Sequence, residues 1–144
     1  MSSEQIIVTE NFHQTQKLGE DIAGEIKSGG FLAFFGDLGS GKTTFVQGFA
    51  KGLGIKRRII SPTFIIVRTY LVKNATFYHI DLYRTQSADD LLGIGLNQII
   101  EGKNNIVALE WAEKMRELLP KKRIDLFFKN LGDDKREIKI IRHE

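Results

Sequence analysis

The sequence contains no cysteine and only three histidines among its 144 residues. The absence of cysteine excludes disulfide bonds, zinc sites with thiolate ligands and a cysteine nucleophile. With only three histidines, we do not expect a metal site built from several imidazoles. This composition is compatible with a reducing cytosol.

Long apolar segments are also missing. The first twelve residues, MSSEQIIVTENF, lack the basic start and the long apolar stretch of a secretory signal. Elsewhere the apolar runs, such as residues 31–35, fall far short of the ~20 residues that span a bilayer. We therefore expect a cytoplasmic protein without a membrane partner.

A strong excess of one charge is absent as well. There are 21 Lys and Arg residues against 18 Asp and Glu, which gives a net charge of +3. This excess is small beside the ~6 to 10 phosphate contacts of a salt-sensitive nucleic-acid binder, so charge does not indicate RNA or DNA binding. Hydrophobic residues make up 42% of the chain and charged residues 27%, as in globular proteins. The length and the lack of linker-like segments predict one domain, residues 1–144.

Apolar patterning predicts alternating strands and helices, followed by an accumulation of strands. The expected strands are residues 6–8, 31–35, 64–72, 76–80, 106–109, 124–128 and 138–141. Helices are expected at residues 11–27, 88–92 and 112–119. A further helix is expected directly after the loop at residues 36–43 and runs to about residue 53. We expect Gly29 and Gly30 to end the first helix and Gly54 to end the second. The alternation predicts an α/β fold in three layers with a mixed, partly parallel sheet.

Residues 36–43, GDLGSGKT, match the Walker A pattern: four residues separate Gly36 from Gly41, and Lys42 and Thr43 follow. Glycines let successive backbone N–H groups turn inward around phosphate oxygens, and the following helix adds its positive end. Lys42 can reach the β- and γ-phosphates of ATP, and the Thr43 hydroxyl can bind Mg²⁺. The alternative is a glycine-rich turn that precedes a helix by chance. The position between a buried-type strand and a helix favours a P-loop NTPase fold.

Two carboxylates follow predicted strands and are candidates to hold the metal or to place an attacking water. Asp81 follows the strand at residues 76–80, and Glu110 follows the strand at residues 106–109. Both are expected at the carboxyl edge of the sheet, where ligands of open α/β sheets bind. The alternative for Asp81 is to cap the turn before Leu82, and for Glu110 to cap the helix that begins at Ala112. The sequence alone leaves both pairs of alternatives open.

Several further blocks extend the match beyond the Walker A pattern. They are GDLGSGKTTF at residues 36–45, SPTF at 61–64, YHIDLYR at 78–84, GIGL at 93–96 and EW at 110–111. In this combination the chain resembles the TsaE family, the small ATPase of bacterial tRNA threonylcarbamoyladenosine biosynthesis. The resemblance implies ATP and Mg²⁺ as cofactors and the TsaD and TsaB subunits as partners. It also implies that tRNA is reached indirectly through that complex.

The resemblance also implies site residues. The nucleotide site carries over to Gly39, Ser40, Gly41, Lys42, Thr43 and Thr44. Phe12 lies in a segment that resembles the part of the family near the nucleotide base. The metal ligands carry over to Thr43 and Glu110, and a functionally important acidic position to Asp81.

Thr63 follows Pro62 in the SPTF block. Its hydroxyl is a candidate to sense the γ-phosphate or the metal, as switch loops of other NTPases do. The alternative is a simple turn hydroxyl. The coincidence with a family block favours the switch.

Three hypotheses for function follow. The leading one is an ATPase in which Lys42, Asp81 and Glu110 are the catalytic candidates, with hydrolysis that resets the TsaD–TsaB complex between cycles and is slow without these partners. The second is a small-molecule kinase that transfers the γ-phosphate of ATP. The third is a nucleotide-gated binding module that needs no turnover.

Overall fold

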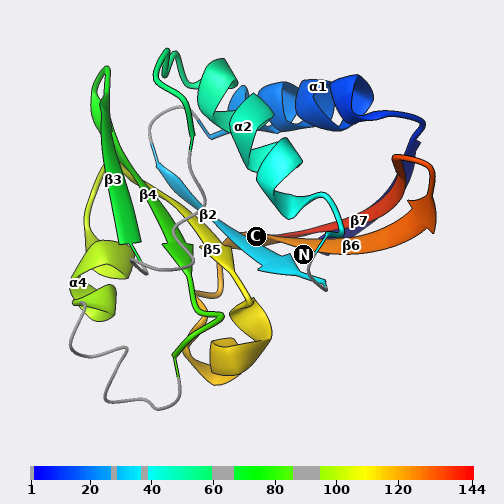
Figure 1. The fold of residues 1–144 in the computed structure, drawn as a ribbon. Coiled ribbons are helices and arrows are strands. Elements are labelled where there is room, and N and C mark those ends of the chain that lie inside the picture. Colours follow the sequence, from blue (N-terminus) through cyan, green and yellow to red (C-terminus); the bar gives the residue numbers. More distant parts are fainter. Residues whose placement is uncertain (1, 27–28, 37–38, 60–66, 86–94) are drawn as a thin grey trace.

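The computed structural model describes residues 2–26, 29–36, 39–59, 67–85 and 95–144, which form a seven-stranded sheet with helices on both faces (Figure 1). The strands are β1 Ser2–Thr9, β2 Gly30–Phe35, β3 Val67–Val72, β4 Ala75–Asp81, β5 Asn105–Glu110, β6 Arg123–Gly132 and β7 Lys135–His143. The helices are α1 Phe12–Ala23, α2 Lys42–Gly52, α4 Leu96–Glu101 and the 3-10 helix η1 Ala112–Leu118. None of the helices in these ranges is long and apolar enough to cross a bilayer.

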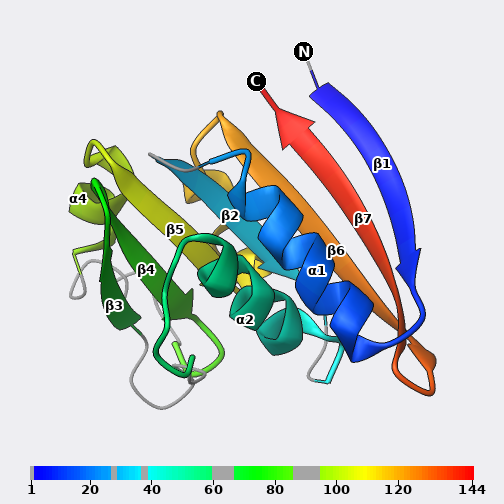
Figure 2. The same cartoon turned by 90° about the horizontal axis from the view of Figure 1, so that it is seen from above.

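The sheet is mixed, as predicted. Its strand order is β1-β7-β6-β2-β5-β4-β3, and the four central strands β6, β2, β5 and β4 run parallel. Antiparallel strands flank them: β3 pairs with β4 on one side, and β7 and β1 follow β6 on the other. Helices α1 and α2 lie side by side over one face of the sheet (Figure 2). Helices η1 and α4 pack on the opposite face, which gives the three layers expected from the sequence.

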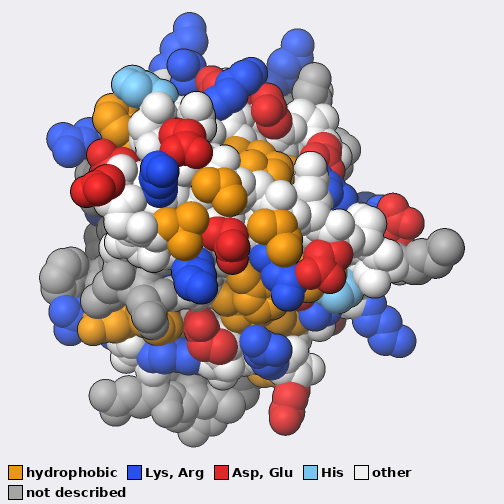
Figure 3. Space-filling view, turned by 90° about the vertical axis from the view of Figure 1, so that its right-hand side faces the viewer, with side chains coloured by type: hydrophobic (Ala, Val, Ile, Leu, Met, Phe, Trp, Pro, Cys, Tyr) orange, Lys and Arg blue, Asp and Glu red, His pale blue; other side chains and the backbone are white. Residues whose placement is uncertain are grey.

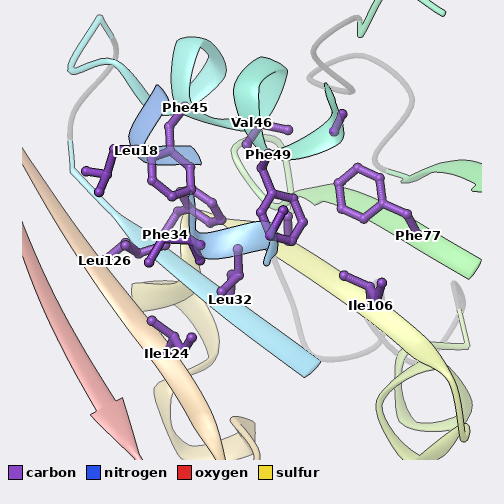
Figure 4. Close-up of a cluster of buried hydrophobic side chains, with 14 of the residues drawn as sticks. Leu18, Leu32, Phe34, Phe45, Val46, Phe49, Phe77, Ile106, Ile124 and Leu126 are labelled. Atoms are coloured by element: carbon purple, nitrogen blue, oxygen red, sulfur yellow. The ribbon is translucent and has the colours of Figure 1, made fainter. Parts of the chain in front are cut away.

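The central strand β2 is buried on both faces because helices cover both. Leu32 and Phe34 point toward α1 and α2, whereas Phe31 and Phe35 belong to the cluster under η1 and α4. Figure 4 shows the cluster on the α1/α2 face, where side chains of the sheet point toward those of both helices. It includes Leu18, Leu32, Phe34, Phe45, Val46, Phe49, Phe77, Ile106, Ile124 and Leu126. An uninterrupted apolar strand is what this double coverage requires.

Helix α1 begins as its sequence suggests but ends earlier than predicted. The Asn11 side chain caps its first turn by accepting a hydrogen bond from the Gln14 N–H at 3.0 Å. The helix stops at Ala23, with Gly24 as its C-cap, so the predicted end at Gly29 and Gly30 is wrong. Ile26 still packs against the core from the segment beyond the helix. Its apolar spacing therefore reflects burial and not a further helical turn.

The other predicted elements are recovered wherever the structure describes them. Helix α2 ends at Gly52, and Gly54 follows in a left-handed conformation with φ +89°. The predicted strand pair is the β3–β4 hairpin, although residues 64–66 lie outside the described residues, as does the helix expected at 88–92. Helix α4, which begins after Gly95, was not predicted from the sequence.

The N-terminal edge of the sheet is held by charge pairs as well as by strand pairing. Lys139 pairs with Glu4, and Lys135 pairs with Glu10, both at 3.3 Å. Hydrophobic side chains lie among charged ones on this side of the molecule (Figure 3). Ile6 and Val8 of β1 are 59% and 47% exposed, so little apolar burial fixes β1. Such exposed pairs contribute up to about 1 kcal/mol each.

Helices α1 and α2 touch backbone to backbone through glycines. A side chain at Gly19 would overlap the Phe45 carbonyl of α2, and one at Gly48 would overlap the Gln16 carbonyl of α1. At Gly52 a Cβ atom would lie 2.7 Å from the Ala23 Cβ. This close approach fixes how α2, and thus its first residue, is placed over the sheet.

We predict that Gly48→Ala destabilises the protein. Alanine is about 1 kcal/mol better than glycine inside a helix, but the overlap with Gln16 forces the helices apart, and overpacking of this kind costs about 1 to 3 kcal/mol or more. Urea unfolding should therefore show a lower free energy of unfolding. Gly29→Ala is the matched control, because a Cβ there meets nothing closer than 3.6 Å. Equal stability of the two variants would contradict the backbone contact.

Candidate functional site

The loop between β2 and α2 has a backbone that requires glycine. Gly36, Gly39 and Gly41 have φ values of +138°, +75° and +104°. A Cβ at Gly36 would also lie 2.8 Å from the Phe128 carbonyl oxygen. Gly41 is the N-cap of α2 and offers no side-chain cap, so the helix presents its N-terminal N–H groups to the loop. The loop residues 37 and 38 lie outside the described residues.

Lys42 is the first residue of α2, and its ammonium group folds back over the loop. Its side chain is buried, and Nζ donates a hydrogen bond to the Gly36 carbonyl at 2.6 Å. The same Nζ lies 4.2 Å from the centre of the Trp111 ring, a cation–π distance. Thr43 and Thr44 follow on the first turn of α2 and are half-buried. The structure therefore places a cation at the loop.

The two candidate carboxylates lie level with the start of this loop. Asp81 at the end of β4 is paired in register with Glu110 at the end of β5, and Glu110 is paired with Phe34 of β2. Both carboxylates lie on the sheet face that α2 covers, because Phe77 of the same β4 face packs against Phe49 of α2. Both are buried, each 3% exposed. Parallel pairing thus brings Asp81 and Glu110 side by side, although they are 29 residues apart in the sequence.

The hydrogen bonds of the two carboxylates bear on the capping alternatives, while their roles toward a metal or a water stay predictions. Asp81 Oδ1 accepts a hydrogen bond from the Tyr83 N–H at 2.8 Å, so this residue does stabilise the turn after β4. Glu110 is not a helix cap: the N-cap of η1 is Trp111, which has no side-chain cap. Glu110 Oε2 instead lies 2.5 Å from Nε2 of His79, a buried histidine of β4.

Trp111 lies at the site, although a single aromatic residue after a strand is more often core filling and we predicted no chemical role for it. Its backbone is in the left-handed region, at φ +61°, which is uncommon for a residue other than glycine. Its ring contacts that of Tyr83, at 5.1 Å between centroids. With Lys42 above it, the indole forms an aromatic wall next to Glu110.

A second contribution that the sequence did not reveal comes from the β6–β7 hairpin. Arg136 Nη2 and Asn130 Nδ2 donate to the Gly39 carbonyl at 3.3 and 3.4 Å. The Arg136 side chain also covers Gly41, where a Cβ would meet it at 3.3 Å. More than 90 residues separate the hairpin from the loop, so no local pattern could have indicated this contact.

Two predicted site residues remain, Phe12 and Thr63. Phe12 begins α1, is 48% exposed, and its ring lies tilted against that of His13, at 4.1 Å between centroids. It lies two residues after Glu10, whose ion pair reaches Lys135, the neighbour of Arg136. Thr63 lies outside the described residues, so its role stays a prediction.

Residues 9–138 match the protein-family model described as "Threonylcarbamoyl adenosine biosynthesis protein TsaE". Curated relatives carry the name tRNA threonylcarbamoyladenosine biosynthesis protein TsaE. The relative from Bacillus subtilis is 41% identical over 130 residues, which cover 90% of this chain and 80% of the relative. The relative from Treponema pallidum is 33% identical, over 92% of this chain and 97% of the relative.

A solved structure is also similar. The crystal structure of Bacillus subtilis YdiB aligns over all of this chain and 88% of its own, with a TM-score of 0.82 and 35% sequence identity. The fold class predicted from the sequence is therefore confirmed.

We predict that Lys42→Ala weakens binding of a nucleoside triphosphate by about 30-fold or more, because removing one member of a buried charge pair costs about 2 to 5 kcal/mol. Titration calorimetry with ATP measures this. Lys51→Ala is the control: it removes an exposed lysine from the other end of the same helix, where it pairs with Glu20. Similar affinities for the two variants would contradict a phosphate-binding role for Lys42.

Proposed function

The chain belongs to the TsaE family of tRNA threonylcarbamoyladenosine biosynthesis proteins, and from that premise we propose that it is an ATPase that binds ATP with Mg²⁺. Its partners in this proposal are the TsaD and TsaB subunits, with tRNA reached through their complex. Hydrolysis of ATP resets that complex between cycles of modification.

One observation carries the proposal: the glycine loop, the buried Lys42 and two buried carboxylates meet at the carboxyl edge of the parallel strands. Open α/β sheets bind ligands at this edge. A loop of this kind binds phosphate through its backbone N–H groups, and a lysine neutralises charge on the β- and γ-phosphates. The arrangement thus supports binding of a nucleoside triphosphate.

Two polar groups at the loop, one from the loop itself and one from β7, lack hydrogen-bond partners among the described residues. The Ser40 hydroxyl and Arg136 Nε are buried and have no hydrogen-bond partner among the described residues. Such groups are costly to bury without a partner. Both lie against loop glycines, Ser40 beside Gly36 and Arg136 beside Gly41. Phosphate oxygens bound with a small adjustment of the loop would supply acceptors for both.

The donor set fits Mg²⁺. Magnesium in phosphate-transfer sites takes one or two protein oxygens and fills its other positions with phosphate oxygens and water. The described residues contain no cluster of three or more His, Cys, Asp or Glu side chains that could hold a metal by themselves, which agrees with such a shared site. Thr43 and Glu110 would hold the ion, which supplies positive charge to the phosphates when bound.

Asp81 and Glu110 are the candidates to orient the attacking water. Both are buried at the carboxyl edge of the sheet, and Asp81 Oδ1 accepts a hydrogen bond from the Tyr83 N–H. Charge on the transferred phosphoryl group must also be neutralised. An arginine supplied by a partner is worth about 10³ to 10⁵ in rate, and we propose that TsaD and TsaB complete the site.

We predict slow ATP hydrolysis by the chain alone and strong stimulation, by about 10³-fold or more if an arginine is supplied, when TsaD and TsaB are added. Release of inorganic phosphate from labelled ATP measures both rates. Equal turnover with and without the partners would contradict the proposal. Transfer of label to a metabolite or nucleoside would instead identify a kinase.

We predict that Glu110→Ala impairs Mg²⁺-dependent hydrolysis much more than nucleotide binding, because Lys42 and the loop still bind the phosphates. Glu113→Ala is the control, since Glu113 lies nearby on η1 and is exposed. Hydrolysis by Glu110→Ala at the rate of Glu113→Ala would remove Glu110 from the metal site. If a variant without hydrolysis still supported repeated modification cycles, ATP would act as a binding signal only.

A further inference from the structure

His79 is a buried polar residue that the proposed mechanism has not yet used. It lies on β4 two residues before Asp81 and is 0% exposed. Strand register pairs it with Ala108, so it reaches Glu110 diagonally across the β4–β5 ladder. Its Nε2 atom lies 2.5 Å from Glu110 Oε2, within hydrogen-bond distance. One imidazole is thus fixed against one oxygen of the candidate metal ligand.

The direction of this hydrogen bond follows from its partners. An ionised carboxylate only accepts hydrogen bonds, so Nε2 carries the ring proton and donates it. In a neutral imidazole Nδ1 is then the unprotonated nitrogen, and it has no hydrogen-bond partner among the described residues. The single ring donor of His79 is therefore used on Glu110. Nδ1 is thus a buried nitrogen without a partner in the part of the chain that the structure describes, which is costly. A residue that only filled space would not need this polar ring, so the bond to Glu110 points to a role for it.

The bond matters because a glutamate side chain has three rotatable bonds. A carboxylate that binds a metal ion must be held in one orientation. Hydrogen-bond partners outside the coordination shell commonly restrict these torsions. Because Oε2 is hydrogen-bonded to His79, the proposal assigns Oε1 to the ion. The imidazole is itself immobilised, because it stacks parallel to Phe77 at 6.3 Å between centroids.

We propose that His79 is a positioning residue that orients Glu110 for Mg²⁺ by donating its Nε2 proton to Oε2. This inference rests on the proposed function, since it takes Glu110 as a ligand of the ion. His79 itself contacts neither nucleotide nor metal in this arrangement.

Two variants separate the hydrogen bond from the bulk of the ring. His79→Phe keeps a planar ring beside Phe77 and removes the donor. His79→Gln keeps an amide Nε2 that can donate to Glu110 from a similar place. We measure ADP affinity by calorimetry with and without Mg²⁺, and the Mg²⁺ concentration that gives half-maximal ATP hydrolysis in the presence of TsaD and TsaB.

We expect His79→Phe to need about tenfold more Mg²⁺ or more, the usual size of effects from outer partners of metal ligands, while its ADP affinity without Mg²⁺ stays close to wild type. His79→Gln should restore most of the Mg²⁺ response. An unchanged Mg²⁺ response in His79→Phe, or equal losses in both variants, would overturn the proposal. If neither the ADP affinity nor the ATP hydrolysis of the wild-type protein depended on Mg²⁺, the proposed metal site would be overturned, and the role of His79 with it.

A measurement on the unaltered protein tests the same point if His79→Phe fails to fold. Nitrogen-15 NMR of the imidazole distinguishes the two ring tautomers. We expect the Nε2–H form, both alone and with Mg²⁺ and ADP. Observation of the Nδ1–H form in the wild type would overturn the proposal, because Nε2 could not then donate to Glu110.

Discussion

The parallel pairing of β4, β5 and β2 is the constraint on which the rest of the site depends. Its register places Asp81 beside Glu110 and Glu110 beside Phe34, so both carboxylates end level with the residue from which the loop departs. Side chains alternate between faces along a strand, so a slip by one residue would turn Glu110 toward η1 and away from α2. Backbone pairing that runs up to Asp81 and Glu110 thus sets where the two carboxylates lie.

The second constraint is the placement of α2, because Lys42 is its first residue. Glycines at the α1–α2 contact bring the helix backbones together, and Phe45 and Phe49 anchor the underside of α2 in the core. The β6–β7 hairpin then holds the loop from the other side through Arg136 and Gly39. A sheet edge, a helix pair and a hairpin therefore meet at one loop, and each is fixed by packing that does not involve a ligand.

Local patterns predicted the loop, the strands around it and the two carboxylates, because each depends on residues close together in sequence. The end of α1 was wrong since Ile26 is buried without being helical, and α4 was missed because its six residues are too few for a clear period. The bond from His79 to Glu110 and the contact of Arg136 with Gly39 could not be predicted. Both depend on strand order, which a single sequence does not reveal.

The contact between Trp111 and Lys42 also has a practical consequence. The chain has a single tryptophan, and its indole ring lies 4.2 Å from the ammonium group at the loop. Indole fluorescence responds to nearby charge, so any ligand that draws this ammonium group toward itself would alter the emission spectrum. Such a ligand would then be detected by the protein's own fluorescence, with no dye or label attached.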